Sequence, residues 1–190
     1  GVEIPEEDWV LFKGCNEHTF YDLSMNRYNI TENREKFMNK GRRYVKAEFD
    51  KNLKIMTGFK EFHNSLKENG IKTALVTASP KEMFLYVDKK LKFSNIFEEI
   101  VIGDMVAKNK PHPDPYLLAF DKLSVLPQNS VVIEDSVHGI NSGLSSGAFV
   151  VGIRGSVPED ELQIAHHIIS SHLELSVNLL KTKLKNSNLN

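Results

Sequence analysis

The 190-residue sequence predicts an α/β protein in which a small helical segment precedes a parallel sheet covered by helices. Two observations lead to this prediction. From about residue 54 onward, short apolar segments alternate with helical patterns of about 10–15 residues, as in connected β-α-β units. Residues 1–53, in contrast, show helical spacing with little strand signal. Right-handed crossovers between the strands then give a mostly parallel sheet with helices on both faces.

Composition and charge exclude several classes of protein. Lys and Arg number 24 against 25 Asp and Glu, so the net charge of −1 gives no electrostatic footprint for nucleic acid. No apolar run approaches the ~20 residues that cross a bilayer. Cys15 is the single cysteine, which excludes an internal disulfide and favours a reducing compartment. Acidic residues from Glu3 onward interrupt any signal-like start, so we expect a cytoplasmic protein and, by default, a monomer.

The first 53 residues predict up to three helices. Pro5 followed by three acidic residues is a favourable helix start, because proline presets φ and acids favour the positive end of the helix dipole. Asn16 and Thr31 are the expected N-caps of two further helices. A segment this short buries little apolar surface, so we do not expect it to fold alone.

The remaining elements follow in order. A helical stripe begins at Phe59 and ends before Gly70, a natural residue after a helix C-terminus, and residues 71–77 form an apolar strand. Ser79-Pro80-Lys81-Glu82 predicts a capping box at the start of the next helix. We expect further strands at 99–102, 131–134, 149–153 and 167–169, and further helices at 113–123, 136–146 and from about 173.

The carboxyl ends of parallel strands are where ligands bind in such sheets, so the residues there are site candidates. The strand at 71–77 ends in Thr77-Ala78-Ser79, which offers a hydroxyl and backbone amides just before a helix N-terminus. This combination suits a phosphate. The alternative is structural: Ser79 caps the helix and Thr77 merely ends the strand.

Two adjacent carboxylates, Glu134 and Asp135, follow the strand at 131–134. Carboxylates leaving an apolar strand are costly unless they are paired or bound to a metal, and hard oxygen ligands suit Mg²⁺. The alternative is that Asp135 caps the following helix while Glu134 points to solvent.

A rigid turn lies between these two strands in the sequence. Lys110 directly precedes Pro111-His112-Pro113, so the direction of its side chain is constrained. Its ammonium group is a candidate for neutralising a phosphate or a buried carboxylate, although a lone lysine in a loop is often only a surface charge. His112 has no partner at metal-ligand spacing, and we interpret it as a surface histidine.

In order and spacing, these motifs together resemble the haloacid dehalogenase (HAD) superfamily. The resemblance is to its branch of β-phosphoglucomutase-like phosphatases and phosphomutases with a helical cap. It covers nearly the whole chain and rests on residues 74–79, 110–114, 132–136 and 139–148. It implies a Rossmann-like α/β core at residues 54–190 and a small helical cap at residues 1–53.

The resemblance also implies Mg²⁺-dependent phosphoryl transfer through an aspartyl-phosphate. The substrate would be a small phosphorylated metabolite such as a sugar phosphate. The matching residues are Thr77 and the Ala78 amide for phosphate oxygens, Lys110 between nucleophile and phosphate, Glu134 and Asp135 for the metal, and Ser136 for orienting Asp135.

The family's first motif, Asp-x-Asp, is absent from the sequence. That motif supplies the nucleophile and the general acid/base, so the resemblance implies that a strand, a linker and a first cap helix belong upstream of Gly1. We therefore expect these 190 residues alone to be inactive. Loss of a central strand would leave two rows of unpaired backbone groups. The alternatives are that a cleaved N-terminal piece remains bound, or that the protein is a non-catalytic binding or regulatory member of the fold.

The stretch Phe12-Lys13-Gly14 resembles the family's substrate-facing cap loop. Related mutases carry an arginine a few residues after this glycine, whereas here the corresponding stretch contains Glu17. An acid would repel a second phosphate, and Lys13 would compensate only in part. We therefore expect a phosphatase, with a β-phosphoglucomutase-type phosphomutase as the alternative.

Overall fold

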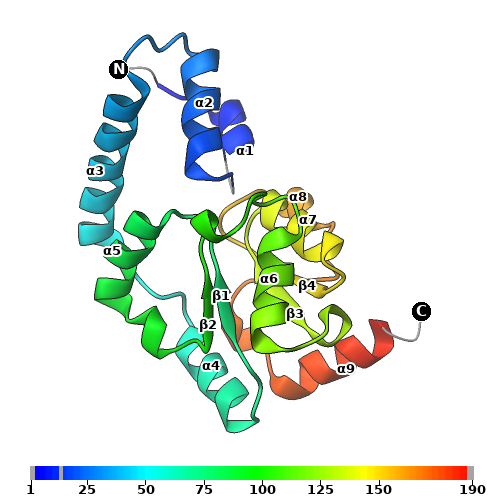
Figure 1. Ribbon diagram of the computed structural model, residues 1–190. Helices are drawn as coiled ribbons and strands as arrows, with labels where there is room; N and C mark the ends of the chain where they lie inside the picture. Colours follow the sequence, from blue (N-terminus) through cyan, green and yellow to red (C-terminus); the bar gives the residue numbers. More distant parts are fainter. Residues whose placement is uncertain (1–2, 13–14, 188–190) are drawn as a thin grey trace.

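The computed structural model describes residues 3–12 and 15–187 and consists of helices arranged around parallel strands (Figure 1). The first helices form a lobe at one end of the molecule, which α3 connects to the rest (Figure 1). Within the described ranges, no helix combines the length and apolar character needed to span a bilayer. The helices of the lobe are a 3₁₀ turn (Glu6–Asp8), α1 (Trp9–Phe12), α2 (Glu17–Arg27) and α3 (Arg34–Asn52).

One of the two predicted N-caps in this lobe is confirmed. The side chain of Asn16 accepts a hydrogen bond from the Thr19 amide (2.9 Å) at the start of α2. The prediction for Thr31 is wrong, because Asn33 caps α3 by accepting from the Lys36 amide (3.2 Å). The turn after α2 passes through Asn29 in the left-handed region (φ 50°), and the chain becomes helical only after residue 33.

The strands are all parallel, as predicted. β1 (Ala74–Val76) pairs with β2 (Glu99–Val101), and β3 (Val131–Glu134), β4 (Phe149–Ile153) and β5 (His167–Ile169) form a second, three-stranded group. Three of these strands have the predicted bounds, whereas β2 ends one residue before the predicted end at 102 and β1 covers only residues 74–76 of the predicted 71–77. Among the described residues, no strand pairs with β1 on the side away from β2, or with β3 on the side away from β4.

Helices cover both faces of the strands. α6, on β1 and β2, and α7, on β3 and β4, lie on one face and contact each other, and residues of α4 and α9 pack on the other face. The helices after the lobe are α4 (Phe59–Glu68), α5 (Lys81–Leu91), α6 (Asp114–Leu123), α7 (Val137–Ser145), α8 (Glu159–Leu162) and α9 (Val177–Ser187). Along the fully buried β4, Phe149, Val151 and Ile153 join one hydrophobic cluster and Val150 joins the other. This alternation follows from the two-residue period of a strand, so the sheet has an apolar layer on each face.

The predicted capping box at the start of α5 is wrong. Pro80 is the N-cap and makes no side-chain bond, and the Asp104 carboxylate instead accepts from the Lys81 amide (2.8 Å). Glu82, the expected partner within the box, turns toward cations of α3 (Lys46 at 2.5 Å). A full positive charge competes better for this carboxylate than a backbone amide does.

Candidate active site

Lys110 joins the carboxyl ends of β1 and β3. Its Nζ donates a hydrogen bond to the Val76 carbonyl at the end of β1 (3.2 Å) and forms an ion pair with Glu134 at the end of β3. Both charged side chains are buried, with 7% and 8% of their surface exposed. Thr77 directly follows Val76, so the structure brings three of the predicted site residues to one edge of the strands.

The loop before α6 is fixed on both sides of Lys110. The Asn109 side-chain amide donates to the Gly103 carbonyl (3.0 Å), and the His112 carbonyl accepts from the Ser142 hydroxyl (2.5 Å) in α7. The His112 side chain is exposed, as expected for a surface histidine. Lys110 therefore enters the site from a loop that is anchored to its neighbours.

Glu134 is held by four donors. Its Oε1 accepts from Lys110 and from the Tyr116 hydroxyl, and its Oε2 accepts from the Asp135 amide (3.2 Å) and the Ser136 hydroxyl (3.3 Å). The alternative in which Glu134 points to solvent is therefore wrong. This carboxylate also explains a glycine in α7, since a Cβ on Gly139 would lie only 2.0 Å from Glu134 Oε2.

Ser136, rather than Asp135, caps α7, because its Oγ accepts from the Gly139 amide (3.1 Å). Asp135 is half-buried, and its Oδ2 accepts a hydrogen bond from Ser156 in the loop after β4. Sequence reasoning gave Ser136 a role in orienting Asp135. In the structure Ser136 contacts Glu134, and Ser156 holds the Asp135 carboxylate.

The two adjacent carboxylates have the donor chemistry that Mg²⁺ prefers. Among the described residues, no group of three or more His, Cys, Asp or Glu side chains converges on one point. Mg²⁺ is nevertheless commonly bound through only one or two carboxylates, with waters and substrate phosphate as the other ligands. Asp135 and Glu134 fit this pattern, and Asp135 is the more accessible of the two.

The phosphate-loop candidate is well ordered by its own contacts. Thr77 Oγ1 accepts from the Ser79 amide (3.1 Å), and the Thr77 amide donates to the Val101 carbonyl (2.9 Å) in β2. Gly103 lies so close to this loop that a Cβ there would be 2.3 Å from the Ala78 carbonyl oxygen. The Thr77-Ala78-Ser79 segment is thus fixed just ahead of α5.

The cap-loop candidates differ from expectation. Lys13 lies outside the described residues. Glu17 forms a two-pronged ion pair with Arg42 (2.5 and 2.8 Å), and 13% of its side chain is exposed. Because Arg42 neutralises this carboxylate, the argument that a free acid at residue 17 repels a second phosphate does not hold.

Two polar residues of the site were missed by sequence reasoning. Tyr116 lies in the first turn of α6, six positions after Lys110, and its ring is 5.0 Å from the Lys110 ammonium. Burial, followed by the charge of Glu134, raises the pKa of Tyr116 well above its usual value. An aromatic residue shortly after the Lys-Pro turn is a signal that could have been noticed. Nothing near Ser156 in the sequence indicates its contact with Asp135.

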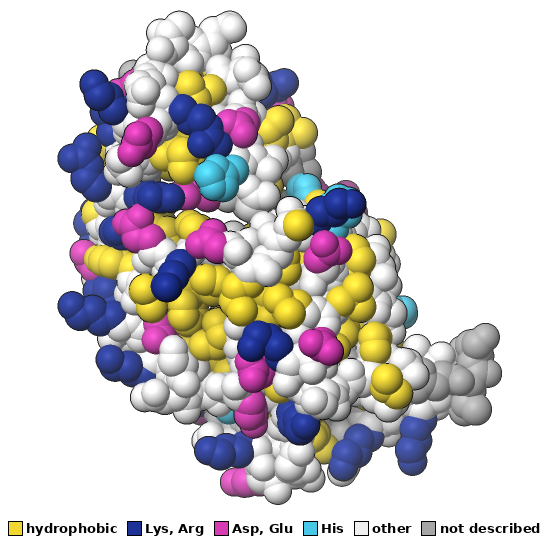
Figure 2. All heavy atoms as spheres, viewed as in Figure 1, with side chains coloured by type: hydrophobic (Ala, Val, Ile, Leu, Met, Phe, Trp, Pro, Cys, Tyr) yellow, Lys and Arg dark blue, Asp and Glu magenta, His cyan; other side chains and the backbone are white. Residues whose placement is uncertain are grey.

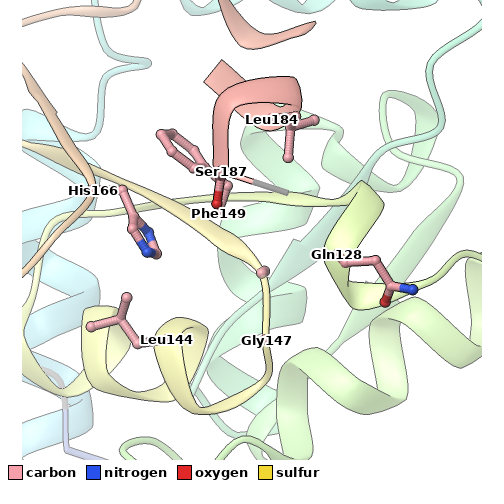
Figure 3. Close-up of a pocket in the computed structure, with 8 residues that line it drawn as sticks. Gln128, Leu144, Gly147, Phe149, His166, Leu184 and Ser187 are labelled. Carbon is pink, nitrogen blue, oxygen red and sulfur yellow. The ribbon is translucent and has the colours of Figure 1, made fainter. Parts of the chain in front are cut away.

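A separate small pocket lies at the opposite ends of the strands (Figure 3). Its volume is about 170 Å³, and Phe149 and Gly147 at the start of β4 are among its lining residues, together with His166. Small-molecule sites usually occupy ~300–1,000 Å³, so this pocket is too small for a metabolite of ordinary size. The residues of the candidate site do not contribute to it.

Comparisons with known proteins identify the family of the chain. The family model described as "Haloacid dehalogenase-like hydrolase" matches residues 2–153. The chain belongs to this family. Among curated relatives, it is 32% identical over 134 residues to a phosphorylated carbohydrates phosphatase of Thermotoga maritima, covering 70% of this chain and 62% of that protein. It is 34% identical over 101 residues to pyrophosphatase PpaX of Bacillus pumilus, covering 53% of this chain and 47% of that protein.

Solved structures of HAD proteins share the fold. β-Phosphoglucomutase from Clostridium difficile matches 100% of this chain and 86% of its own, with a TM-score of 0.87 and 24% identity. A HAD hydrolase from Entamoeba histolytica matches 98% of this chain and 86% of its own, with a TM-score of 0.84 and 24% identity. The chain therefore has the HAD fold, although it spans less than two thirds of the length of the curated relatives named above.

Proposed function

We propose that the complete protein hydrolyses a small phosphate ester, such as a sugar phosphate, by Mg²⁺-dependent phosphoryl transfer through an aspartyl-phosphate. The observation that carries the proposal is the position of Lys110. A buried ammonium joins the end of β1, where Thr77 begins the phosphate loop, to the end of β3, where Asp135 offers a carboxylate. We further propose that the protein acts in the cytoplasm, which its single cysteine favours, and that it is a monomer.

Each residue has a role that follows from its chemistry. Thr77 and the Ala78 amide bind phosphate oxygens, and Lys110 offsets the negative charge that would otherwise repel an anionic nucleophile. Asp135 and Glu134 hold Mg²⁺, directly or through water. When bound, the metal supplies further charge compensation on the phosphoryl oxygens. Ser156 keeps the Asp135 carboxylate in one orientation.

The nucleophile of this proposal comes from outside the 190 residues. No Asp-x-Asp pair occurs in the sequence. We propose that a strand carrying it pairs between β1 and β3, since each has an edge that pairs with no strand of the described residues. A strand there would end beside Lys110, within reach of the phosphate loop.

The test compares these 190 residues with the longer product of the same gene. We expect only the longer protein to release phosphate from a panel of sugar phosphates, and EDTA to abolish that release. Lys110→Ala in the longer protein should remove the activity, whereas Lys108→Ala, at an exposed position two residues away, should retain it. Equal EDTA-sensitive activity in both proteins would refute the proposed nucleophile. Inactivity of both would favour the non-catalytic alternative.

A phosphomutase remains the second candidate, and Arg42 is the observation that favours it. Its guanidinium pairs with Glu17 and with Glu82, so the acid near the cap loop is neutralised and no longer argues against a second phosphate. A mutase must hold such a second phosphate. Interconversion of hexose phosphate isomers without release of phosphate would identify this activity in the same panel.

A further inference from the structure

Tyr116 places a hydroxyl between two buried charges. It is 5% exposed, and its hydroxyl donates to Glu134 Oε1, the same oxygen that pairs with Lys110. The surroundings are apolar, with Phe120, Val132 and Ile140 among the neighbouring core residues. A polar group that is buried in such a cluster and bonded to an ion pair is a costly arrangement unless all its partners are satisfied.

The direction of this hydrogen bond is fixed by chemistry. An ionised carboxylate can only accept, so the tyrosine must donate. The Lys110 Nζ also lies over the face of the Tyr116 ring, 5.0 Å from the ring centroid. At this position the cation is attracted to the π electrons.

The hydrogen bonds of the Lys110 ammonium indicate the role of Tyr116. An ammonium group has three N–H donors, and Glu134 and the Val76 carbonyl each take one. We propose that Tyr116 is a positioning residue for Lys110: by sharing Glu134 Oε1, it weakens the hold of this carboxylate on the ammonium and leaves the third N–H for a phosphate at the Thr77 loop. This inference rests on the proposed function, in which that loop binds phosphate.

Removal of the hydroxyl has a definite consequence. In Tyr116→Phe the ring stays, but Glu134 loses one neutral donor and attracts Lys110 more strongly. The potential at the phosphate position becomes more negative. A hydrogen bond to a charged group contributes a substantial free energy. Loss of the bond to Glu134 should therefore lower the affinity for phosphate roughly fivefold to thirtyfold.

Phe120 provides a matched control. Its ring stacks on that of Tyr116 with centroids 6.4 Å apart, and it is 7% exposed. Phe120→Leu perturbs the same apolar cluster one helical turn away but removes no donor from Glu134. A purely structural role for Tyr116 predicts that both variants lose phosphate affinity in proportion to their loss of stability.

The experiment uses the longer product of the same gene with inorganic phosphate as the ligand. Affinity is measured by isothermal titration calorimetry, stability by urea unfolding, and the environment of Lys110 by the NMR signal of its ¹³C-labelled ε-carbon. We expect Tyr116→Phe to weaken phosphate binding and to shift the Lys110 signal, and Phe120→Leu to do neither. Unchanged binding and an unchanged Lys110 signal in Tyr116→Phe would overturn the inference, as would equal effects in the two variants.

The same data separate this inference from the proposed function. If the unsubstituted protein binds phosphate and Lys110→Ala abolishes binding while urea unfolding shows that the variant is still folded, the phosphate site stands and Tyr116→Phe alone decides the inference. If the unsubstituted protein does not bind phosphate, the phosphate site is wrong. The Lys110 signal then decides whether Tyr116 positions the ammonium: a shift in Tyr116→Phe alone supports that role, and no shift overturns it.

Discussion

The Arg42 guanidinium in α3 lies 2.8 Å from the Glu82 carboxylate in the first turn of α5. This contact is one of several between the two helices, and α3 ends beside α5 (Figure 1). Acidic and basic side chains are interspersed on this side of the molecule (Figure 2). The facing residues are Arg42, Lys46 and Asp50 of α3, and Glu82, Tyr86 and Lys90 of α5. Because Arg42 also binds Glu17, the network runs from α2 to the helix that follows the Thr77 loop.

Glu82→Gln should weaken this contact between α3 and α5. Glu82 is 50% exposed, so the expected loss of unfolding free energy is only about 0.5–1 kcal/mol, and salt should reduce it further. Urea unfolding at low and high ionic strength measures the effect. Glu48→Gln is the control, because Glu48 pairs with Lys51 within α3 and does not contact α5. An equal, salt-independent effect in both variants would contradict the prediction.

Lys110→Met should be strongly destabilising. It leaves the buried Glu134 carboxylate without its cation, and loss of one partner of a buried pair typically costs about 3–5 kcal/mol. Lys108→Met, at an exposed position in the same loop, should change stability by no more than about 0.5 kcal/mol. In the double variant Lys110→Met, Glu134→Gln, much of the loss should be recovered, because no unpaired charge remains. Chemical unfolding of the unsubstituted protein, the two lysine variants and the double variant tests this, and similar losses in Lys110→Met and in the double variant would argue against this account.

The effect of Gly139→Ala on stability should depend on whether the Glu134 side chain is present. In the natural sequence the new Cβ would collide with the Glu134 carboxylate at 2.0 Å, and overpacking of this kind costs about 1–3 kcal/mol. In a Glu134→Ala background the collision disappears. Gly139→Ala should then leave the free energy of unfolding unchanged or raise it by up to about 1 kcal/mol, because alanine favours a helix more than glycine does. Thermal unfolding of both pairs tests this, and a destabilisation of equal size in both backgrounds would show that another neighbour is responsible.

His63 should make stability depend on pH. Its ring is buried near Phe59 and Phe97 and lies 3.1 Å from Thr73 Oγ1, and burial lowers the pKa of this imidazole below its usual 6.5. The unfolded chain therefore binds a proton at a higher pH than the folded chain does. The resulting loss of stability is absent above about pH 6.5 and grows as the pH falls toward the lower folded pKa.

Urea unfolding between pH 5 and 8 tests this prediction. Replacement of the histidine, as in His63→Gln, should flatten part of the acid-side decline, and the remaining slope should include His172, whose pKa burial also lowers. His112→Gln, at an exposed position, serves as the control and should leave the profile unchanged. A profile of the His63→Gln variant identical to that of the unsubstituted protein would contradict this assignment.

The sequence alone determined the features that depend on local pattern. β4 and β5 have the predicted bounds, because apolar β-branched runs between turn residues form strands wherever they are buried. The parallel arrangement followed from the alternation of strands and helices, and the positions of Thr77, Lys110 and Glu134 at one edge followed from the parallel arrangement. Their roles in binding phosphate and metal remain predictions.

The tertiary structure alone decided which polar groups meet. Glu82 suited a local capping box but pairs with two cations of α3, some forty positions away in the sequence. Glu17 had no visible partner until the fold placed Arg42 beside it. Tyr116 received no role from the sequence, yet its hydroxyl reaches Glu134. Such pairings depend on distance in space and on the exclusion of water, neither of which is encoded by spacing along the chain.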